Sequence, residues 1–226
     1  MTHILDRPAW NALHTAHADL AVGSPLALRY PPSIVPFAAA ADDTPESLDI
    51  LASLPVGDEI MALVEAGPIA IPAGLAVLID AQLVQMTADQ PHPRISDPRI
   101  RPLDESDAKD MLELALLTKP GPFTLGAQKL GTFWGVKIDG RLVAMAGQRM
   151  RLTGFGELSG LCTHPEFQGR GLGKLLFRFV AGEIGARGDT AFLHAYSTNT
   201  HAIGLYQALG FSVRERMNLR IVQRQA

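Results

Sequence analysis

The sequence predicts an α/β protein of the α+β kind, because strand-like and helix-like stretches alternate along its length. One observation behind this is an apolar run at 157–163 that leads into a glycine-rich loop and then a helical pattern. Another is the pair Asp139-Gly140 between two strand-like runs, which signals a hairpin because Gly tolerates the positive φ of tight turns. A third is the proline-rich stretch 88–98, which is typical of a linker between two parts.

The first part, residues 1–95, is expected to be an α/β half. Asp6 and Pro8 suit the start of a helix whose partial apolar stripe runs to Leu20. Thr44, followed by a proline, is expected to cap a second helix. The expected strands cover 26–30, 33–41, 59–64 and 75–86. This half contains no glycine-rich loop, so we do not expect it to hold a phosphate group.

The second part, residues 96–226, shows a clearer order of elements. Its expected strands cover 100–103, 132–138, 141–152, 157–163, 190–197 and 211–222. Ser106 is expected to cap a helix, and a short helix at 201–209 should end at Gly210. The helix after the glycine-rich loop carries an apolar stripe at i, i+3, i+4 and i+7, formed by Leu172, Leu175, Leu176 and Phe179.

The last expected strand alternates between apolar and polar residues. The residues expected on its core face are Phe211, Val213, Met217, Leu219 and Ile221. Arg214, Arg216 and Arg220 alternate with them, so we interpret these arginines as a solvated sheet face.

Composition limits the classes of function that fit the chain. Its 226 residues are 47% hydrophobic, which allows a sizeable core, and the net charge of -3 offers no basic footprint for nucleic acid. The single cysteine excludes an internal disulfide and fits a reducing, cytoplasmic location. We see no signal peptide, no membrane span and no set of metal ligands. The expected state is a monomer or a homodimer, without nucleic acid or membrane as a partner.

The glycine-rich loop is the most informative stretch of the chain. It reads Gln168-Gly169-Arg170-Gly171-Leu172-Gly173-Lys174, between a strand pattern and a helix start. Backbone N–H groups at a helix start have no intrahelical partner, and the helix dipole there favours negative charge. The glycines allow a bulky ligand to approach the backbone closely. The loop therefore predicts a phosphate-bearing cofactor rather than a glycine-rich turn without a ligand.

Two common phosphate-binding motifs do not fit this loop. A Walker A loop would need Gly where Gln168 stands and a Ser or Thr where Leu175 follows Lys174. A dinucleotide fingerprint would need the spacing G-x-G-x-x-G, whereas Gly169, Gly171 and Gly173 alternate with other residues. The ligand is therefore expected to belong to another class of phosphate-bearing cofactor.

Two stretches together resemble the GNAT superfamily of N-acetyltransferases. Residues 161–173, which contain the loop, resemble the acetyl-CoA signature of that superfamily, Gln/Arg-x-x-Gly-x-Gly/Ala. Residues 199–211 resemble its second pattern, N-x-x-A-x-x-L-Y-x-x-x-G-F, about 30 residues further along. The resemblance covers roughly Arg99 to Ala226, and within it the C-terminal half of glycine N-acyltransferase-like proteins is the nearest subfamily. It implies a mixed, mostly antiparallel sheet flanked by helices, with an N-terminal half that lacks the CoA loop.

The resemblance also implies how acetyl-CoA is held. The backbone of Gln168 to Gly173 would cradle its pyrophosphate, with Arg170 and Lys174 adding positive charge. The strand before the loop would splay from its neighbour, so that the backbone of Leu161, Cys162 and Thr163 pairs with the pantetheine arm. Asn199 matches the family asparagine that contacts the cofactor from the end of the next strand.

Two residues are candidates for acid or nucleophilic chemistry. Tyr206 matches the family tyrosine that donates a proton to the departing thiolate, and its ordinary pKa near ~10 keeps it protonated at neutral pH. The alternative is an aromatic side chain that only packs on its helix. Cys162 is a possible nucleophile, but a cysteine in an apolar strand is more often a small buried side chain.

The base that deprotonates the amine has three candidates. An alkylamine with a pKa near ~10 is almost fully protonated at neutral pH, so it needs a base or a chain of water molecules. Glu157 opens the strand before the loop, and His194 lies in the middle of the following strand. A water relay is the third route.

The sequence thus predicts an acetyl-CoA-dependent N-acetyltransferase in which a primary amine of a small molecule or peptide attacks the thioester directly. One alternative is a non-catalytic acyl-CoA-binding or regulatory module, and another is a protein N-terminus acetyltransferase. The acceptor is expected to be selected by loops, including 118–128, whose sequence carries no recognisable code.

Overall fold

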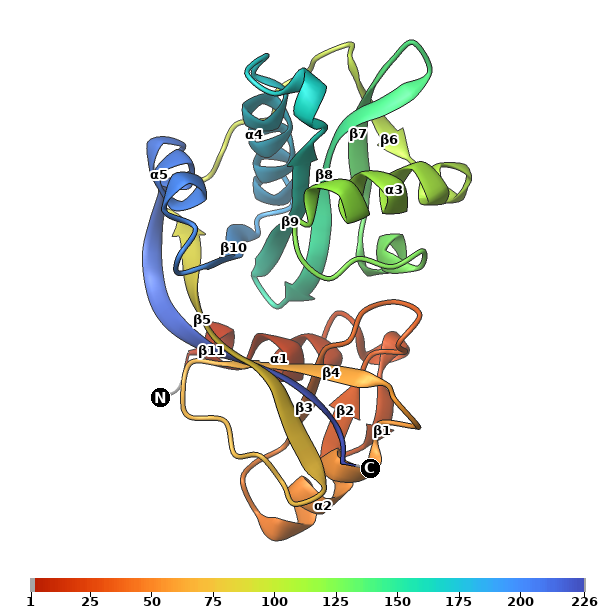
Figure 1. The fold of residues 1–226 in the computed structure, drawn as a ribbon. Helices are drawn as coiled ribbons and strands as arrows, with labels where there is room; N and C mark the ends of the chain where they lie inside the picture. Colours follow the sequence, from red (N-terminus) through yellow and green to blue (C-terminus); the bar gives the residue numbers. More distant parts are fainter. Residues whose placement is uncertain (1–2, 226) are drawn as a thin grey trace.

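The computed structural model describes residues 3–225, which form one sheet of eight strands and a smaller one of three. The order in the large sheet is β4-β11-β5-β10-β9-β8-β7-β6. Its neighbours pair antiparallel except for β10 and β9, which are parallel. The prediction of a mixed, mostly antiparallel sheet flanked by helices is confirmed (Figure 1).

The first part of the chain supplies the small sheet and two strands of the large one. Its elements are η1 (Ile4–Asp6), α1 (Pro8–Leu13), η2 (Ala18–Leu20), β1 (Val22–Ser24), β2 (Ala27–Arg29), β3 (Ala38–Ala40), α2 (Pro45–Ser53), β4 (Ile60–Glu65) and β5 (Leu75–Ala88). The expected cap of α2 is confirmed, because the Thr44 hydroxyl accepts the N–H of Ser47 at 3.4 Å.

Two expected elements in this part are shorter than predicted. The helix that was expected to run to Leu20 ends at Leu13, because the N–H of His17 bonds back to the carbonyl of Ala12 in a tight turn. The strand expected at 33–41 is limited to β3, since Ile34 donates to the carbonyl of Pro31 and closes a turn instead.

The second part supplies the other six strands and the helices around them. Its elements are β6 (Ile100–Leu103), η3 (Glu105–Asp107), α3 (Ala108–Thr118), η4 (Ala127–Leu130), β7 (Phe133–Ile138), β8 (Arg141–Leu152), β9 (Phe155–Thr163), η5 (Pro165–Phe167), α4 (Leu172–Gly185), β10 (Thr190–Tyr196), α5 (Thr200–Ala208) and β11 (Phe211–Arg224). The hairpin between β7 and β8 is confirmed, with positive φ at Asp139 and Gly140.

Three details of this part differ from the prediction. Asp104, rather than Ser106, caps the turn before α3, and its carboxylate accepts the N–H of Ser106 at 2.8 Å. The buried face of α4 includes Phe177 and Val180, while Leu175 and Phe179 are only half-buried. The face of α4 that meets the sheet is therefore rotated slightly from the predicted stripe.

The third difference is in β11, where a β-bulge lies between Val213 and Glu215. The bulge shifts the alternation of the strand, so Val213 is 44% exposed instead of buried. It also turns Arg214 inward, against the expectation of a solvated face, whereas Arg216 is exposed.

Two long strands run through both parts of the molecule. β5 and β11 pair with each other along their whole length, and they connect the region of α4 and α5 with the region of α1 and α2 (Figure 1). The expected boundary at residues 95 and 96 lies in the segment between β5 and β6, yet β4 and β5 pair with β11 across it. The division of the chain into two domains stays a prediction.

Candidate active site

The glycine-rich loop forms an open cradle at the N-terminus of α4. Gly169 and Gly171 both have a φ of +76°, and a Cβ atom added at either would meet no atom within 4 Å. Gly171 is the N-cap residue of this 14-residue helix, and no side chain bonds to its first N–H groups. The loop therefore needs glycine for its backbone conformation, and it leaves unpaired donors facing open space.

Polar side chains of the loop shape it and give it positive charge. Gln168 donates to the carbonyl of Thr163 at 3.4 Å, which ties the loop to the end of β9. The guanidinium of Arg170 lies 4.7 Å from the ring centre of Phe167 and donates to the carbonyl of Glu166. Lys174, in the first turn of α4, is exposed. These contacts leave both cations at the surface of the cradle, where they favour an anion.

The strand before the loop separates from its neighbour. β9 pairs with β10 only from Phe155 to Glu157, so residues 158–163 have no strand partner on that edge. On the other edge, β9 pairs with β8, where Met145 faces Cys162 and Ala144 faces Thr163. The backbone of Leu161 to Thr163 therefore offers a free strand edge, next to the cradle, to an extended ligand with amide groups.

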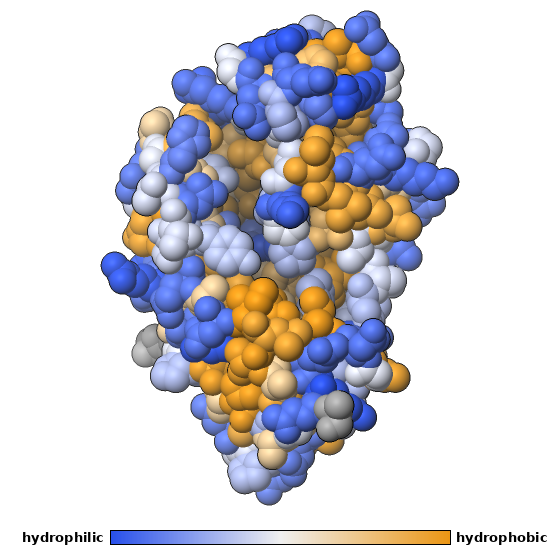
Figure 2. Space-filling model, viewed as in Figure 1, coloured by the Kyte–Doolittle hydropathy of each residue, from blue (hydrophilic) through white to orange (hydrophobic). Residues whose placement is uncertain are grey.

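A cavity of about 290 Å³ begins at this free edge and extends between the two parts of the chain. It is lined by residues of β4, β5, β8, β9, β10, β11 and α5, by Phe37 before β3, and by the segment Thr118–Pro122 at the end of α3. The lining includes Leu161, His194, Asn199 and Tyr206 from the predicted site. Figure 2 shows this face hollowed in its upper half, with a hydrophobic band below the hollow.

Tyr206 and Asn199 lie at the α5 side of the cavity. The Tyr206 ring stacks on Phe177 of α4, with centroids 5.3 Å apart and planes at 17°. No hydrogen bond within residues 3–225 involves its hydroxyl, and burial raises its pKa. Asn199 caps α5, because its side-chain oxygen accepts the N–H of Ala202 at 3.1 Å. The roles of Tyr206 as an acid and of Asn199 as a contact to the cofactor stay predictions, which this geometry allows.

Cys162 lies on the opposite face of β9 from the cavity. Its side chain belongs to a core cluster with Met111 and Leu114 of α3, and only 8% of it is exposed. Burial raises the pKa of its thiol to about 11. A thiol with so little thiolate at neutral pH is a poor nucleophile, so the side chain serves as a small buried hydrophobe.

Glu157 and His194, the two candidate bases, are in direct contact. Their Oε1 and Nδ1 atoms are 2.7 Å apart. Arg149 of β8 holds the same carboxylate with two hydrogen bonds of 2.6 and 2.9 Å, and the N–H of Met150 adds a fourth. Burial alone would raise the pKa of Glu157, but the charge and bonds of Arg149, with a bond from His194, lower it below its ordinary value. Glu157 is therefore a fully bonded carboxylate without any exposed surface.

The second ring nitrogen of His194 is also bonded. Nε2 lies 2.9 Å from the amide nitrogen of Gln85 on β5, and that nitrogen also donates to the carbonyl of Leu5. The amide oxygen of Gln85 accepts from Arg214, which in turn donates to Asp6 at 2.7 Å. Neither candidate base therefore has a free lone pair in this arrangement.

Sequence reasoning missed Arg149, Gln85 and Arg214 as members of this network. A local signal existed for Arg149, because it and Glu157 lie on opposite sides of the Thr153-Gly154 turn and a hairpin brings them together. The sequence contains no comparable signal for Gln85 and Arg214, because they are 129 residues apart and meet only through strand pairing.

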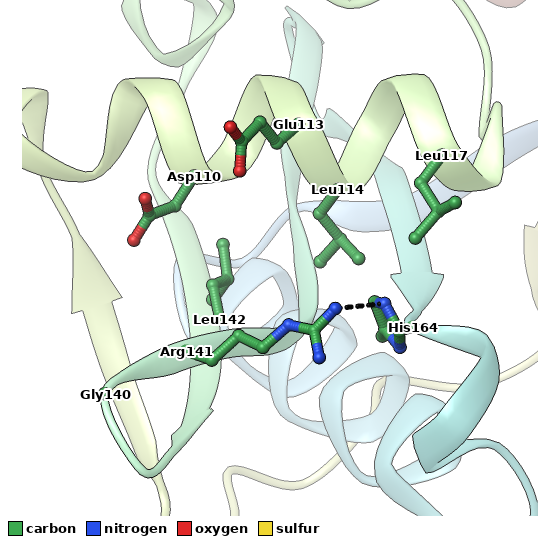
Figure 3. A pocket seen from close by; sticks show the side chains of 8 residues that line it. All are labelled: Asp110, Glu113, Leu114, Leu117, Gly140, Arg141, Leu142 and His164. Atoms are coloured by element: carbon green, nitrogen blue, oxygen red, sulfur yellow. Dashed lines mark hydrogen bonds between the residues drawn. The ribbon is translucent and has the colours of Figure 1, made fainter.

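A second, smaller hollow of about 190 Å³ lies between α3 and the start of β8. Asp110 and Glu113 project from α3 on one side, while Arg141 reaches across to His164, with 2.6 Å between Nη2 and Nε2 (Figure 3). This hollow shares no lining residue with the larger cavity and contains none of the predicted site residues.

Within residues 3–225, no group of three or more His, Cys, Asp or Glu side chains is placed to hold a metal ion. No helix in the same range is long and apolar enough to span a membrane.

Known proteins resemble this chain in sequence and in fold. Residues 135–221 match the family described as FR47-like protein. A GCN5-related N-acetyltransferase from Kribbella flavida shares the fold, with a TM-score of 0.58 over 97% of this chain and 96% of that one, at 16% identity. A stretch of 56 residues is 39% identical to the [ribosomal protein bS18]-alanine N-acetyltransferase of Salmonella typhimurium, and it covers 24% of this chain and 38% of that curated relative.

A full-length relative identifies the family. A solved structure from Novosphingobium aromaticivorans, assigned to the GNAT family of acetyltransferases, is 45% identical to this chain. It covers 100% of both chains, and its TM-score is 0.93. Since this relationship extends over the whole sheet, the cradle and the cavity, the chain belongs to the GNAT family of acetyltransferases.

Proposed function

We propose that the protein is an acetyl-CoA-dependent N-acetyltransferase in which a primary amine attacks the thioester directly. The observation that carries this proposal is a single cavity that joins the free edge of β9 to the unbonded hydroxyl of Tyr206. The cradle follows this strand edge directly in the sequence, and acyl transfer from a CoA thioester needs an anion site, a strand edge and an acid within reach of one ligand.

The residues of the cradle fit the phosphate end of acetyl-CoA. Positive φ at Gly169 and Gly171, open space above both, and the charges of Arg170 and Lys174 suit a pyrophosphate. The free edge at 161–163 would bind the amide groups of the pantetheine arm. When bound, the cofactor supplies an acetyl group that is already activated as a thioester.

We propose Tyr206, which lines the cavity, as the acid. In direct transfer the amine nitrogen would bond to the acetyl carbon while the carbon–sulfur bond breaks and its electron pair stays on sulfur. The Tyr206 O–H would donate a proton to that sulfur, and the tyrosine oxygen would regain a proton, through water, from the acylated nitrogen. Because burial raises the pKa of Tyr206, the hydroxyl holds its proton at neutral pH until charge develops on the sulfur.

The proton of the incoming ammonium group leaves by the water route. Glu157 uses its carboxylate oxygens on Arg149, His194 and the N–H of Met150, and His194 uses both ring nitrogens. The His194→Gln variant should therefore keep kcat within about 10-fold of wild type, whereas loss of a direct base costs about 10²–10⁴-fold.

A thermal-shift experiment with a matched control tests the cradle. CoA at about 100 times its Kd should stabilise the wild type by ~2.7 kcal/mol. Gly171→Glu should abolish this shift, because it fills the cradle and adds negative charge. Gly188→Glu is the control: Gly188 also has a positive φ of +80° and open space around it, but it lies outside the cradle, in the turn after α4. Equal loss of the shift in both variants would contradict the proposed site.

Thiol release from acetyl-CoA in the presence of amines tests turnover. CoA binding without thiol release for any amine would favour the non-catalytic module instead. The name of the curated Salmonella relative makes a peptide N-terminus the second acceptor to assay, and an alanine-starting peptide is a suitable probe.

A further inference from the structure

We infer that the acceptor is a small monoamine with an apolar body, bound on an apolar wall that both parts of the chain build. This inference rests on the proposed function and adds the chemical class of the acceptor. It follows from three features of the cavity: the composition of its wall, its charge, and the way its shape is held.

One part of the cavity wall is apolar. The first part contributes Phe37, Val64 and Leu83, and β11 contributes Leu219 and Ile221. All five side chains belong to one core cluster, and none is more than 9% exposed. A polar acceptor would lose water against this wall without gaining hydrogen bonds, whereas an alkyl or aryl group gains free energy by burial.

The cavity also lacks carboxylates that could bind a second ammonium group. Among the described residues, none of those that line it is Asp or Glu. Its two cationic residues are Arg149, which pairs with the unexposed carboxylate of Glu157 at 2.6 Å, and the exposed Lys119 at the end of α3. Diamines and polyamines would thus place a positive charge beside a cation or an apolar surface, which disfavours them.

The wall is held in place rather than adaptable. The guanidinium of Arg149 lies 4.8 Å from the ring centre of Phe37, so the ion pair with Glu157 also fixes this ring. The backbone of Phe37 is bridged to Ala62 of β4, which lines the same cavity. A fixed wall around about 290 Å³ suits a small molecule better than a peptide chain.

The test uses the full chain, acetyl-CoA and four amines, with released thiol as the first readout. Phenethylamine and hexylamine carry apolar bodies, spermidine carries further ammonium groups, and an alanine-starting peptide represents the macromolecular acceptor. We expect kcat/KM for the two apolar amines to exceed that for spermidine and for the peptide by at least 10-fold. Equal or higher values for spermidine or the peptide would overturn the inference while leaving the proposed function intact.

A pair of leucine variants on one strand locates the binding wall. Leu83→Ala should lower kcat/KM for phenethylamine about 10-fold, with the KM for acetyl-CoA unchanged. Leu78→Ala is the matched control on β5, because Leu78 is 53% exposed and does not line the cavity. An equal effect of the two substitutions would overturn the inference.

Direct binding separates a failure of the inference from a failure of the proposed function. Calorimetry on the CoA-saturated protein should show phenethylamine binding at least 10-fold more tightly than spermidine. If this preference holds and no amine releases thiol, the acceptor cavity stands and the catalytic proposal fails. If neither amine binds, the inference is wrong.

Discussion

The side-chain amide of Gln85 determines which nitrogen of His194 carries the proton. Its NH2 group must face the Leu5 carbonyl at 2.9 Å, because two oxygens would repel there, and its oxygen must face the N–H of Arg214. The same NH2 group therefore donates to Nε2 of His194, which leaves the proton on Nδ1, where it bonds to Glu157. Nitrogen-15 spectra of the imidazole should show the proton on Nδ1.

Replacing Gln85 should cost stability because it leaves buried partners without bonds. Gln85→Leu removes the partner of the Leu5 carbonyl, of His194 and of Arg214, so we expect a loss of about 2–4 kcal/mol in the free energy of unfolding. Gln82→Leu on the same strand removes an exposed amide that bonds to Asn218, and it should change this free energy by less than about 0.5 kcal/mol. Urea unfolding of both variants makes the comparison, and similar losses would contradict the network.

The ion pair of Arg149 and Glu157 should make stability depend on pH in a defined window. Because the folded pKa of Glu157 is below its ordinary value, its stabilising contribution is fully present above the unfolded pKa of about 4.3. That contribution is lost as the pH falls through the lower, folded pKa. Glu157→Gln should lower the free energy of unfolding by about 3–5 kcal/mol at pH 7, since it leaves Arg149 buried without a counterion.

The difference between wild type and Glu157→Gln should begin to shrink below about pH 4, because the unfolded chain then binds a proton at Glu157 that the folded protein, with its lower pKa, does not bind. Glu166→Gln serves as a control, because Glu166 pairs with Arg141 where both side chains are exposed, and this variant should stay close to wild type at pH 7. Denaturant titrations from pH 3 to pH 8 measure all three proteins. A gap that stays constant over this range would show that Glu157 is not the titrating group.

Tyr206→Phe tests the acid in the proposed reaction. The variant keeps the ring that stacks on Phe177 and removes only the hydroxyl, so kcat should fall roughly 10- to 1000-fold with little change in CoA affinity. Tyr30→Phe is the control, because the Tyr30 hydroxyl bonds to His17 outside the cavity, and its loss should leave kcat unchanged. Wild-type kcat in Tyr206→Phe, measured where chemistry limits the rate, would reduce Tyr206 to a packing residue.

Cys162 should be inert in the folded protein. With its pKa raised to about 11, its alkylation by iodoacetamide at pH 8 should be at least about 100-fold slower than in urea, where the thiol has an ordinary pKa of ~8.5. It is the single cysteine of the chain, so the rate of labelling reports on it alone. Cys162→Ala should retain kcat within about 3-fold, and complete loss of activity in a folded variant would instead indicate a covalent route.

Local patterns in the sequence were enough to predict the cradle and the α5 motif, because each lies within one short segment. The strand, loop and helix of 157–185 depend on neighbouring residues only, and so does the hairpin at Asp139-Gly140. The hydrogen-bond network around Glu157 and His194 depends instead on residues that are distant in the sequence. Asp6 and Arg214, for example, are 208 residues apart. The β-bulge after Val213 turns Arg214 inward, and no residue type in the sequence indicates that bulge.

The position of β11 between β4 and β5 has a consequence for how the chain folds during its synthesis. Both of its neighbours are made more than a hundred residues earlier, and they do not pair with each other in the finished sheet. Until β11 emerges, each has at least one unpaired edge, and the acceptor wall lacks Leu219 and Ile221. Assembly of the sheet therefore depends on pairing between strands that are distant in the sequence. Such pairing is slow and leaves the early strands open to wrong partners. A nascent chain halted before residue 211 should accordingly depend on chaperones and lack acceptor binding, even with its CoA cradle fully translated.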